Sequence, residues 1–294
     1  MDQQLIQLFV NGIAVGSIIA LAAVGLTLTY GILRLANFAH GDLMSLGAYF
    51  TLTAEAFIPP ALGAFRIWVA IAIGALLTIG VALVTEKLLW SPMRDRRVSS
   101  TTLIIISIGL ALFLRNGIIL LWGAGNQRYQ VPVLSALNFF GVRITQSRVI
   151  VVVLAIVAIL GLHYLLQNTK IGKAMRAVAD NVDLARVSGI NVERVVIWTW
   201  VIAAGLTAVG GGMYGLITAV RPDMGWFLIL PMFAAVILGG IGNPYGAIAG
   251  AYVIGIAQEI STYFLPAEYK LAVALIFMVM VLFVRPQGIF RGTM

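Results

Sequence analysis

The sequence predicts an all-α, polytopic membrane protein with about eight to nine transmembrane helices and one cytoplasmic loop helix. The 294 residues have a mean hydropathy of +1.02, with 61% hydrophobic and only 10% charged residues, whereas average soluble domains are more polar. The apolar runs are long and do not alternate with polar residues, which favours helices of roughly 20 residues over the strands of a membrane barrel. The chain contains no cysteine, which excludes disulfides, thiolate metal sites and cysteine nucleophiles.

Nine apolar segments follow one another without a long polar domain between them, so we expect a single transmembrane domain over 1–294. The first segment is expected to be a retained span, because no Lys or Arg precedes it to form the positive region of a signal peptide. Segment 227–240 is short and contains Pro231, so it is expected either to cross or to enter as a half-helix and return. The nine segments are 5–33, 43–58, 67–90, 100–122, 148–166, 195–220, 227–240, 247–264 and 269–284.

Lys and Arg gather in three connecting segments, which set the expected orientation. By the positive-inside rule these segments face the cytoplasm, so the N-terminus is expected outside and the C-terminus inside. The 123–147 loop is then outside, although Arg128, Arg143 and the adjacent Arg148 oppose this. Orientation accounts for the net charge of +8, so no nucleic-acid partner is expected. The three groups are Lys87, Arg94, Arg96 and Arg97, then the five Lys and Arg residues of 167–194, and finally Arg285 and Arg291.

The longest polar interruption is segment 167–194, and its pattern predicts an amphipathic helix from Gly172 to Ser188. Arg176 and Asp180 are four residues apart, which is the spacing of a stabilising ion pair, and Gly189 follows as a C-terminal cap. One face carries Lys173, Arg176, Asp180 and Asp183, and the opposite face carries Met175, Val178, Val182 and Ala185.

Two interpretations of this helix are possible. It can lie on the membrane surface with its basic residues at the lipid headgroups. However, Leu184 and Val187 project on the charged side, where a surface-lying helix gains nothing from apolar residues. A protein partner accounts for them better.

Three separated stretches resemble one known family in the family's order. The run GKAMRAVADNVDLARVSGINVERV resembles the cytoplasmic loop of LivH-type permeases, the membrane subunits of bacterial ABC importers for branched-chain and other neutral amino acids. NGIAVGSIIALAAVGLTLTYGILRLANFAHGDLMSLGAY resembles the family's first spans, and ILGGIGNPYGAIAGAY resembles its glycine-rich turn near the C-terminus.

The resemblance implies a non-catalytic permease subunit in the inner membrane of a prokaryote. Its implied partners are a homologous LivM-type permease, two ABC ATPase subunits and a substrate-binding protein at the outer face. The subunit itself would need no cofactor, because the ATPases use the ATP. Segment 167–194 would supply the coupling helix that docks on an ATPase, although it has Asp180 and no Glu-Ala-Ala run. The expected coupling residues are Arg176, Ala177, Asp180, Asn181, Leu184, Val187 and Gly189.

A second polar group, from Asn37 through His40 to Asp42, lies at the junction of the first two spans. Ionisable groups at membrane depth are costly and normally face a cavity or a partner, so these residues are candidates for a translocation path or gate. The simpler interpretation is a tight turn in which Asn37 and Asp42 cap helix ends. Asn243 and Glu259 are further candidates for the path.

A weak internal repeat is expected between 31–58 and 236–264. HGDLMSLGAY and YGAIAGAY both follow an Asn and lead into a span in the same expected direction. The glycine-rich turn around Asn243 has no following Lys-Ser or Lys-Thr, so it is not expected to bind ATP.

Two other functional classes remain open. Glu259 within an apparent span is the main support for an ion-coupled secondary transporter, which would need a carboxylate as its ion site. An intramembrane enzyme would need partners for His40 or His163, and no metal-ligand cluster or nucleophile is spaced to join either. Within the ABC importers, permeases for urea or short-chain amides share the architecture and are an alternative to an amino acid permease.

Overall fold

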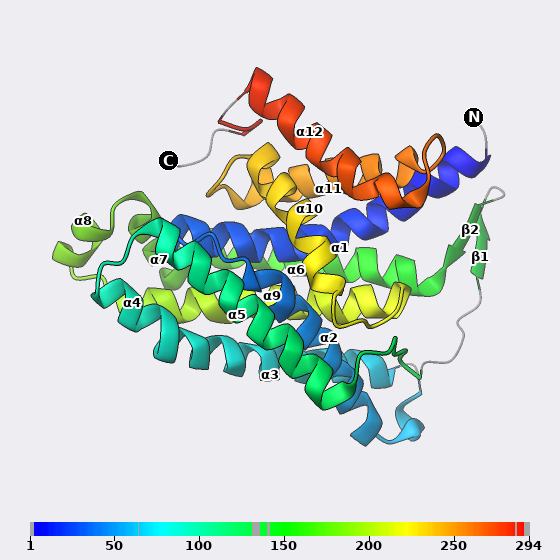
Figure 1. Cartoon of the computed structure of the whole chain (residues 1–294), viewed down its shortest axis with the longest axis horizontal. Coiled ribbons are helices and arrows are strands. Elements are labelled where there is room, and N and C mark those ends of the chain that lie inside the picture. Colours follow the sequence, from blue (N-terminus) through cyan, green and yellow to red (C-terminus); the bar gives the residue numbers. More distant parts are fainter. Residues whose placement is uncertain (1–2, 64, 131–135, 140–141, 286, 291–294) are drawn as a thin grey trace.

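The computed structural model describes residues 3–63, 65–130, 136–139, 142–285 and 287–290 (Figure 1). It is 82% helical, and each of the nine predicted segments holds a helix. These helices are α1 (Gln3–Leu33), α2 (Ala39–Phe57), α3 (Phe65–Thr85), α5 (Ser100–Trp122), α6 (Gln146–Asn168), α9 (Val192–Ile217), α10 (Met224–Gly239), α11 (Pro244–Ser261) and α12 (Lys270–Val284).

The connecting segments hold shorter elements. Among the described residues they are η1 (Pro60–Leu62), the π-helix η2 (Glu86–Trp90), α4 (Ser91–Asp95), β1 (Ala136–Phe139), β2 (Val142–Thr145), α7 (Lys170–Asp180), α8 (Val182–Val187) and η3 (Ala267–Tyr269). The two strands form an antiparallel hairpin, which the sequence analysis did not predict.

Six helical stretches within the described residues are long and apolar enough to cross a membrane. Helix α10 is apolar but has only 16 residues. Helices α2 and α11 have 19 and 18 residues but are less apolar than the six stretches. Many of their residues are buried against neighbouring helices. Their composition therefore reflects helix packing, where small and polar side chains are tolerated.

Helix α1 forms the centre of the structure and contacts α6, α9, α10 and α11 (Figure 1). Close approach to α11 depends on glycines: a Cβ at Gly12 would lie 2.7 Å from the Cα of Ile256, and one at Gly16 would lie 3.1 Å from the Cα of Tyr252. Small residues at such crossings let two backbones approach within van der Waals contact.

Helices α2 and α10 both begin inside the protein. The non-helical residues before α2 pack against α5, where the backbone N–H of Phe38 donates to Ser107 Oγ at 3.1 Å. The first turn of α10 crosses α2, with the N–H of Gly225 donating to Ser45 Oγ at 2.9 Å. Irregular backbone at membrane depth is stable only where protein or a water-filled cavity surrounds it.

The expected alternatives for segment 227–240 are resolved by this geometry. Val220, before α10, forms a bridge to Gln127 in the loop after α5, and α10 ends at the turn into α11. The chain therefore crosses here, but only 16 residues of the crossing are helical. The expected half-helix that returns to its own side is wrong.

The ends of the helices divide into two sets (Figure 1). Helices α4, α7 and α8 lie at one end. In the described tail, Ile289 N–H donates to Leu238 O at the end of α10. The start of α1 and the β-hairpin lie at the other end, where Arg148 donates to Asn11 Oδ1. The predicted grouping of the three basic segments on the cytoplasmic side stays a prediction, and Arg291 lies outside the described residues. Which end is cytoplasmic stays a prediction.

The loop after α5 is fixed against α2. Tyr129 donates its hydroxyl to Ala48 O at 3.1 Å, and burial raises the pKa of this hydroxyl far above its ordinary value, so it remains a donor.

Helices α2 and α11 show the local similarity that the repeat predicts. Asn37 Oδ1 accepts from the N–H of Ala39, and Asn243 Oδ1 accepts from the N–H of Tyr245, each two residues further on. The two helices also run in the same direction (Figure 1). The repeat itself stays a prediction.

Candidate functional site: a coupling surface and a buried ionic cluster

The polar segment 167–194 forms two helices rather than the single helix predicted. Thr169 Oγ1 caps α7 by accepting from Gly172 N–H at 3.1 Å. The chain then leaves helical geometry at Asn181, with φ −156° and ψ 109°. The Asn181 side chain accepts from Leu184 N–H at 2.9 Å and so starts α8. Asn is a strong N-cap residue, which is the physical reason for the break.

The predicted faces of this segment are confirmed across both helices. Met175 and Val178 are each 1% exposed and Ala185 is 3% exposed, and these side chains pack onto the transmembrane helices. Leu184 and Val187 are 62% and 82% exposed on the outside of α8. Covering such an apolar pair by another molecule would be favourable.

The remaining predicted coupling residues line the same outer surface. Asp180, Asn181 and Gly189 are exposed, and Ala177 is half-buried. Gly189 ends α8 with a φ of +85°, as its predicted role as a cap requires.

Arg176 differs from the prediction. It is exposed, but it donates to Gln167 Oε1 and forms no ion pair with Asp180. The bond to Gln167 ties α7 to the end of α6. We call the exposed outer surface of α7 and α8 the coupling surface.

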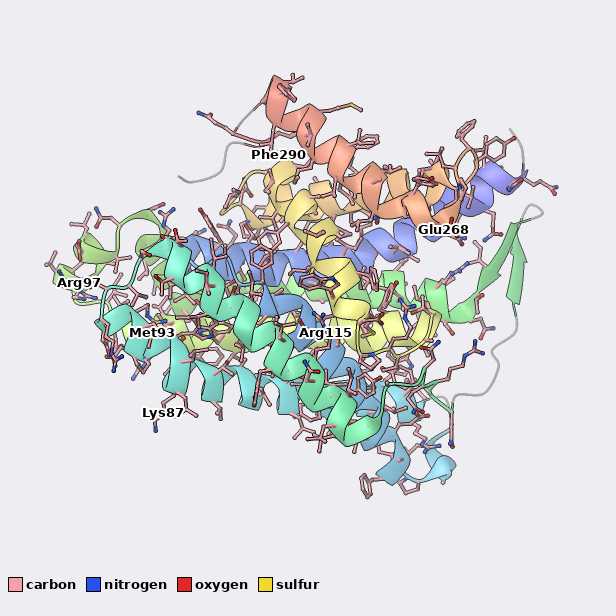
Figure 2. All side chains as sticks on the ribbon, in the orientation of Figure 1. Lys87, Met93, Arg97, Arg115, Glu268 and Phe290 are labelled. Carbon is pink, nitrogen blue, oxygen red and sulfur yellow. The ribbon has the colours of Figure 1, made fainter. Side chains whose placement is uncertain are left out.

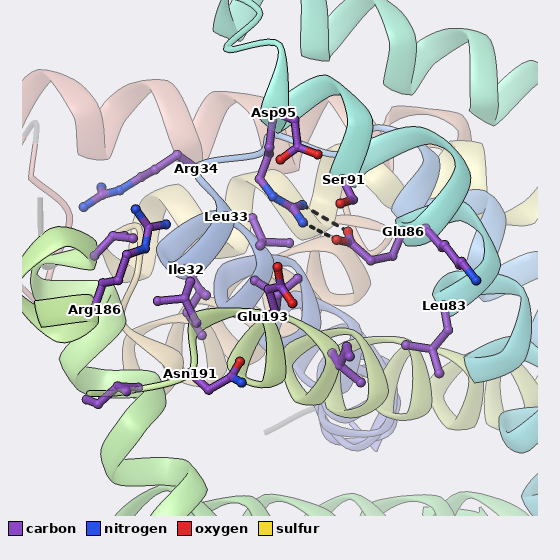
Figure 3. Close-up of a pocket in the computed structure, with 17 residues that line it drawn as sticks. Ile32, Leu33, Arg34, Leu83, Glu86, Ser91, Asp95, Arg186, Asn191 and Glu193 are labelled. Carbon is purple, nitrogen blue, oxygen red and sulfur yellow. Dashed lines mark hydrogen bonds and ion pairs between the residues drawn. The ribbon is translucent and has the colours of Figure 1, made fainter. Parts of the chain in front are cut away.

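A groove of about 910 Å³ lies beside the coupling surface (Figure 3). It separates α8 and the start of α9 from the end of α1 and from the continuous helix Phe65–Asp95. The groove is lined by acidic, basic and apolar side chains. The charged residues are Arg34, Glu86, Lys87, Arg94, Asp95, Arg186 and Glu193.

One wall of the groove is held by Glu86, which sequence analysis missed. Glu86 is buried, forms a two-pronged ion pair with Arg94, and accepts from Trp200 Nε1–H at 2.6 Å. Trp200 on α9 stacks on Trp90, with ring centroids 6.4 Å apart. These contacts join α9 to the π-helix η2. A π-helix is a local distortion of an α-helix and is frequent at functional positions. The sequence feature that could have indicated this ion pair is a Glu at the end of an apolar run, eight residues before an Arg.

His40 is fully buried between three helices. Its Nε2 atom lies 2.9 Å from Ala22 O on α1 and 2.8 Å from Thr207 Oγ1 on α9. A carbonyl can only accept, so the proton is on Nε2, and Nδ1 has no partner among the described residues. Asn37 is also buried, and its Oδ1 accepts from the N–H of Ala39 in the first turn of α2, but Phe38 rather than Asn37 is the N-cap residue.

Asp42 does not act as a helix cap. No side-chain cap is formed at the start of α2, and the Asp42 carboxylate instead forms a two-pronged ion pair with Arg115 on α5. The Nε–Oδ1 and Nη2–Oδ2 distances are both 3.1 Å. The Arg115 guanidinium carbon lies 4.7 Å from the ring centroid of Trp226 on α10. Arg115 and Trp226 were not predicted. The sequence feature that could have indicated this cluster is an Arg within an apolar span.

Asn243 and Glu259 lie apart from this cluster. Asn243 caps α11 by accepting from the N–H groups of Tyr245 and Gly246. Glu259 forms an ion pair with Lys270 at the start of α12, near the other end of α11. Glu259 is therefore paired, rather than the isolated acid that the sequence suggested.

His163 lies at the end of α6, where Nδ1 is 2.8 Å from the Tyr245 hydroxyl. Within the described residues no group of three or more His, Cys, Asp or Glu side chains is arranged to hold a metal ion.

A protein-family model described as "Branched-chain amino acid transport system / permease component" matches residues 8–284. The chain belongs to this family. It is 32% identical to the LivH permease protein of the high-affinity branched-chain amino acid transport system of Salmonella typhimurium, covering 97% of this chain and 94% of that protein. It is 30% identical to BraD of Pseudomonas aeruginosa, covering 97% and 95%. The resemblance to LivH-type permeases is confirmed.

Solved ABC transporter structures share the fold. One, an inward-facing metal-chelate type ABC transporter, has a TM-score of 0.53 at 15% identity and covers 95% of this chain and 84% of that one. PsaBC from Streptococcus pneumoniae in complex with Fab has a TM-score of 0.52 at 14% identity, with coverage of 98% and 94%. The chain is thus a multi-pass membrane permease component of the ABC type.

Proposed function

We propose that this permease component carries branched-chain or other neutral amino acids through the inner membrane, driven by ATP hydrolysis on separate ATPase subunits. A binding protein would deliver the substrate to the outer face, and a LivM-type permease would supply the other half of the path. Support comes from the names of the relatives, which are 30–32% identical over nearly the whole chain. The permease itself would be non-catalytic.

The coupling surface is proposed to face the cytoplasm and dock on an ATPase. The single observation that carries this proposal is the exposed apolar pair Leu184 and Val187 on α8. Burying two such side chains against a partner would stabilise the contact by roughly 25 cal/mol per Å² of apolar surface covered. With this end inside, the N-terminus is outside and the C-terminus cytoplasmic.

Motion of the coupling surface would reach the spans through two connections. Arg34 at the end of α1 donates to Ala179 O on α7 at 3.5 Å, and α8 leads directly into α9, which Trp200 joins to Glu86. A displacement of α8 would therefore be passed to α9 and, through Trp200, to the helix that contains Glu86. The groove beside α8 leaves space for α8 itself to move.

The test is Leu184→Asp, with Leu184→Met as the matched control. Substrate-stimulated ATP hydrolysis and uptake are measured in the complete complex in liposomes. Asp places a charge in the contact, so we expect stimulation and uptake to fall strongly, whereas Met keeps the contact apolar and both activities. Unchanged stimulation in Leu184→Asp would overturn the coupling proposal.

The alternative substrates, urea and short-chain amides, are separated by the ligand of the binding protein. Calorimetry with leucine, urea and acetamide measures this directly. We expect leucine to bind. An ion-coupled carrier would lose uptake when the membrane potential and proton gradient are collapsed while ATP is maintained.

A further inference from the structure

Arg115 is a charged side chain inside an apolar span. It lies 15 residues after the start of α5 and 7 before its end, which at 1.5 Å per residue is about 22 Å and about 10 Å along the helix. Figure 2 shows Arg115 between α5 and α10. Its side chain is 16% exposed, whereas that of its partner Asp42 is 1% exposed. The guanidinium is therefore covered on the Asp42 side and partly open on another.

The hydrogen bonds of Arg115 leave one edge of the guanidinium free. Nε and one N–H of Nη2 donate to Asp42, and Nη1 donates to no group among the described residues. A guanidinium has five N–H donors in a rigid plane, and each edge can hold a carboxylate through two parallel bonds. The edge formed by Nη1 and the second N–H of Nη2 matches a second carboxylate.

The position of this edge is fixed by its neighbours. Trp226 covers one face of the guanidinium, and Asp42 holds it in plane. Asp42 and Trp226 are brought together by the contact of α2 with α10, in which a Cβ on Gly225 would lie 1.8 Å from the carbonyl oxygen of Gly41. A polar group held this firmly loses little entropy when it binds a ligand.

The open edge should not face lipid, because charged groups within a membrane face protein or a water-filled cavity. Trp226 beside it is 41% exposed in the single chain, so this side of α5 and α10 is available to a path between two permeases. Asp42 already balances the charge of Arg115, so attraction of a second carboxylate is moderate. A transport path needs sites weak enough for the substrate to leave.

We propose that the open edge of Arg115 binds the carboxylate of the α-amino acid during its passage through the membrane. This inference rests on the proposed function. Asp42 acts as a positioning residue that holds the guanidinium, and Trp226 lies over one of its faces. The site would recognise the carboxylate common to all α-amino acids, and leave discrimination among side chains to the binding protein.

The experiment uses the absence of cysteine from the chain. A single Trp226→Cys variant is assembled with cysteine-free partner subunits and treated with a membrane-impermeant, charged thiol reagent. Phe113→Cys is the control, because Phe113 lies on α5 near Arg115 and is 73% exposed. We expect Trp226→Cys to be labelled and Phe113→Cys, facing lipid, to resist labelling.

Labelling is then repeated with excess leucine or with leucinol, which lacks the carboxylate. We expect leucine to slow labelling of Trp226→Cys severalfold and leucinol to have little effect. Adding Arg115→Lys, which keeps the charge but loses the planar edge, should abolish the protection. Unlabelled Trp226→Cys, or equal effects of leucine and leucinol, would overturn the inference.

Uptake of leucine by the complex with the unsubstituted chain is measured in parallel. If uptake occurs but carboxylate-dependent protection does not, the inference fails and the proposed function stands. If ATP-driven leucine uptake is absent, the proposed function fails.

Discussion

The coupling surface and the Asp42–Arg115 cluster each place side chains in an environment that does not suit them alone. Leu184 and Val187 are apolar and largely exposed at the polar end of the molecule. Asp42 and Arg115 are charged and lie within the spans. The first pair gains free energy by being covered, and the second is stable only because its members hold each other.

The two regions depend on the rest of the chain in different ways. The coupling surface belongs to two short helices joined in sequence, and its outer side chains contact little else. The cluster combines α2, α5 and α10, so changing one residue affects three helices. We therefore expect substitutions in the cluster to change stability, and substitutions on the coupling surface to change activity.

The largest effect is expected for Asp42→Asn. Removing the carboxylate leaves a largely covered guanidinium without its counter-charge, and for a fully buried pair this typically costs about 3–5 kcal/mol. We expect a lower thermal unfolding temperature for the purified permease and a lower yield of assembled complex. The double variant Asp42→Asn with Arg115→Met, which removes both charges, should recover most of the loss. If Asp42→Asn were as stable as the native chain, the ion pair would not hold the helices together.

A smaller effect is expected for Gly225→Ala. The added Cβ would overlap the Gly41 carbonyl, and forcing backbones apart in a packed region costs about 1–3 kcal/mol. Gly117→Ala on α5 is the matched control, since nothing lies within 4 Å of a Cβ there. Thermal unfolding of both variants should show a loss for Gly225→Ala and none for Gly117→Ala. Equal stability would mean that α2 and α10 do not pack as closely as described.

The local features of the fold could be predicted from sequence, because they depend on neighbouring residues. Apolar runs gave the nine helical segments, and helical periodicity placed Met175 inside and Val187 outside. The break at Asn181 was missed because a helix pattern continues through it. The capping bond to Leu184 N–H, rather than the pattern of faces, decides the local structure there.

The interior contacts could not be predicted, because they join residues far apart in sequence. Arg115 meets Asp42 across 73 residues, and Trp200 meets Glu86 across 114. Sequence position alone assigned Asp42 to a helix cap, since it lies in the first turn of α2. Only the arrangement of α5 beside α2 shows that an arginine satisfies it instead.

Docking of the coupling surface on an ATPase is tested by thiol labelling of Val187→Cys in the permease with and without its ATPase subunits. Val187 is 82% exposed in the single chain, so the cysteine should react rapidly in the permease alone. Docking of the coupling surface should then slow labelling strongly when cysteine-free ATPase subunits are added. Equal labelling in both states, with assembly shown by size-exclusion chromatography, would rule out docking through the coupling surface.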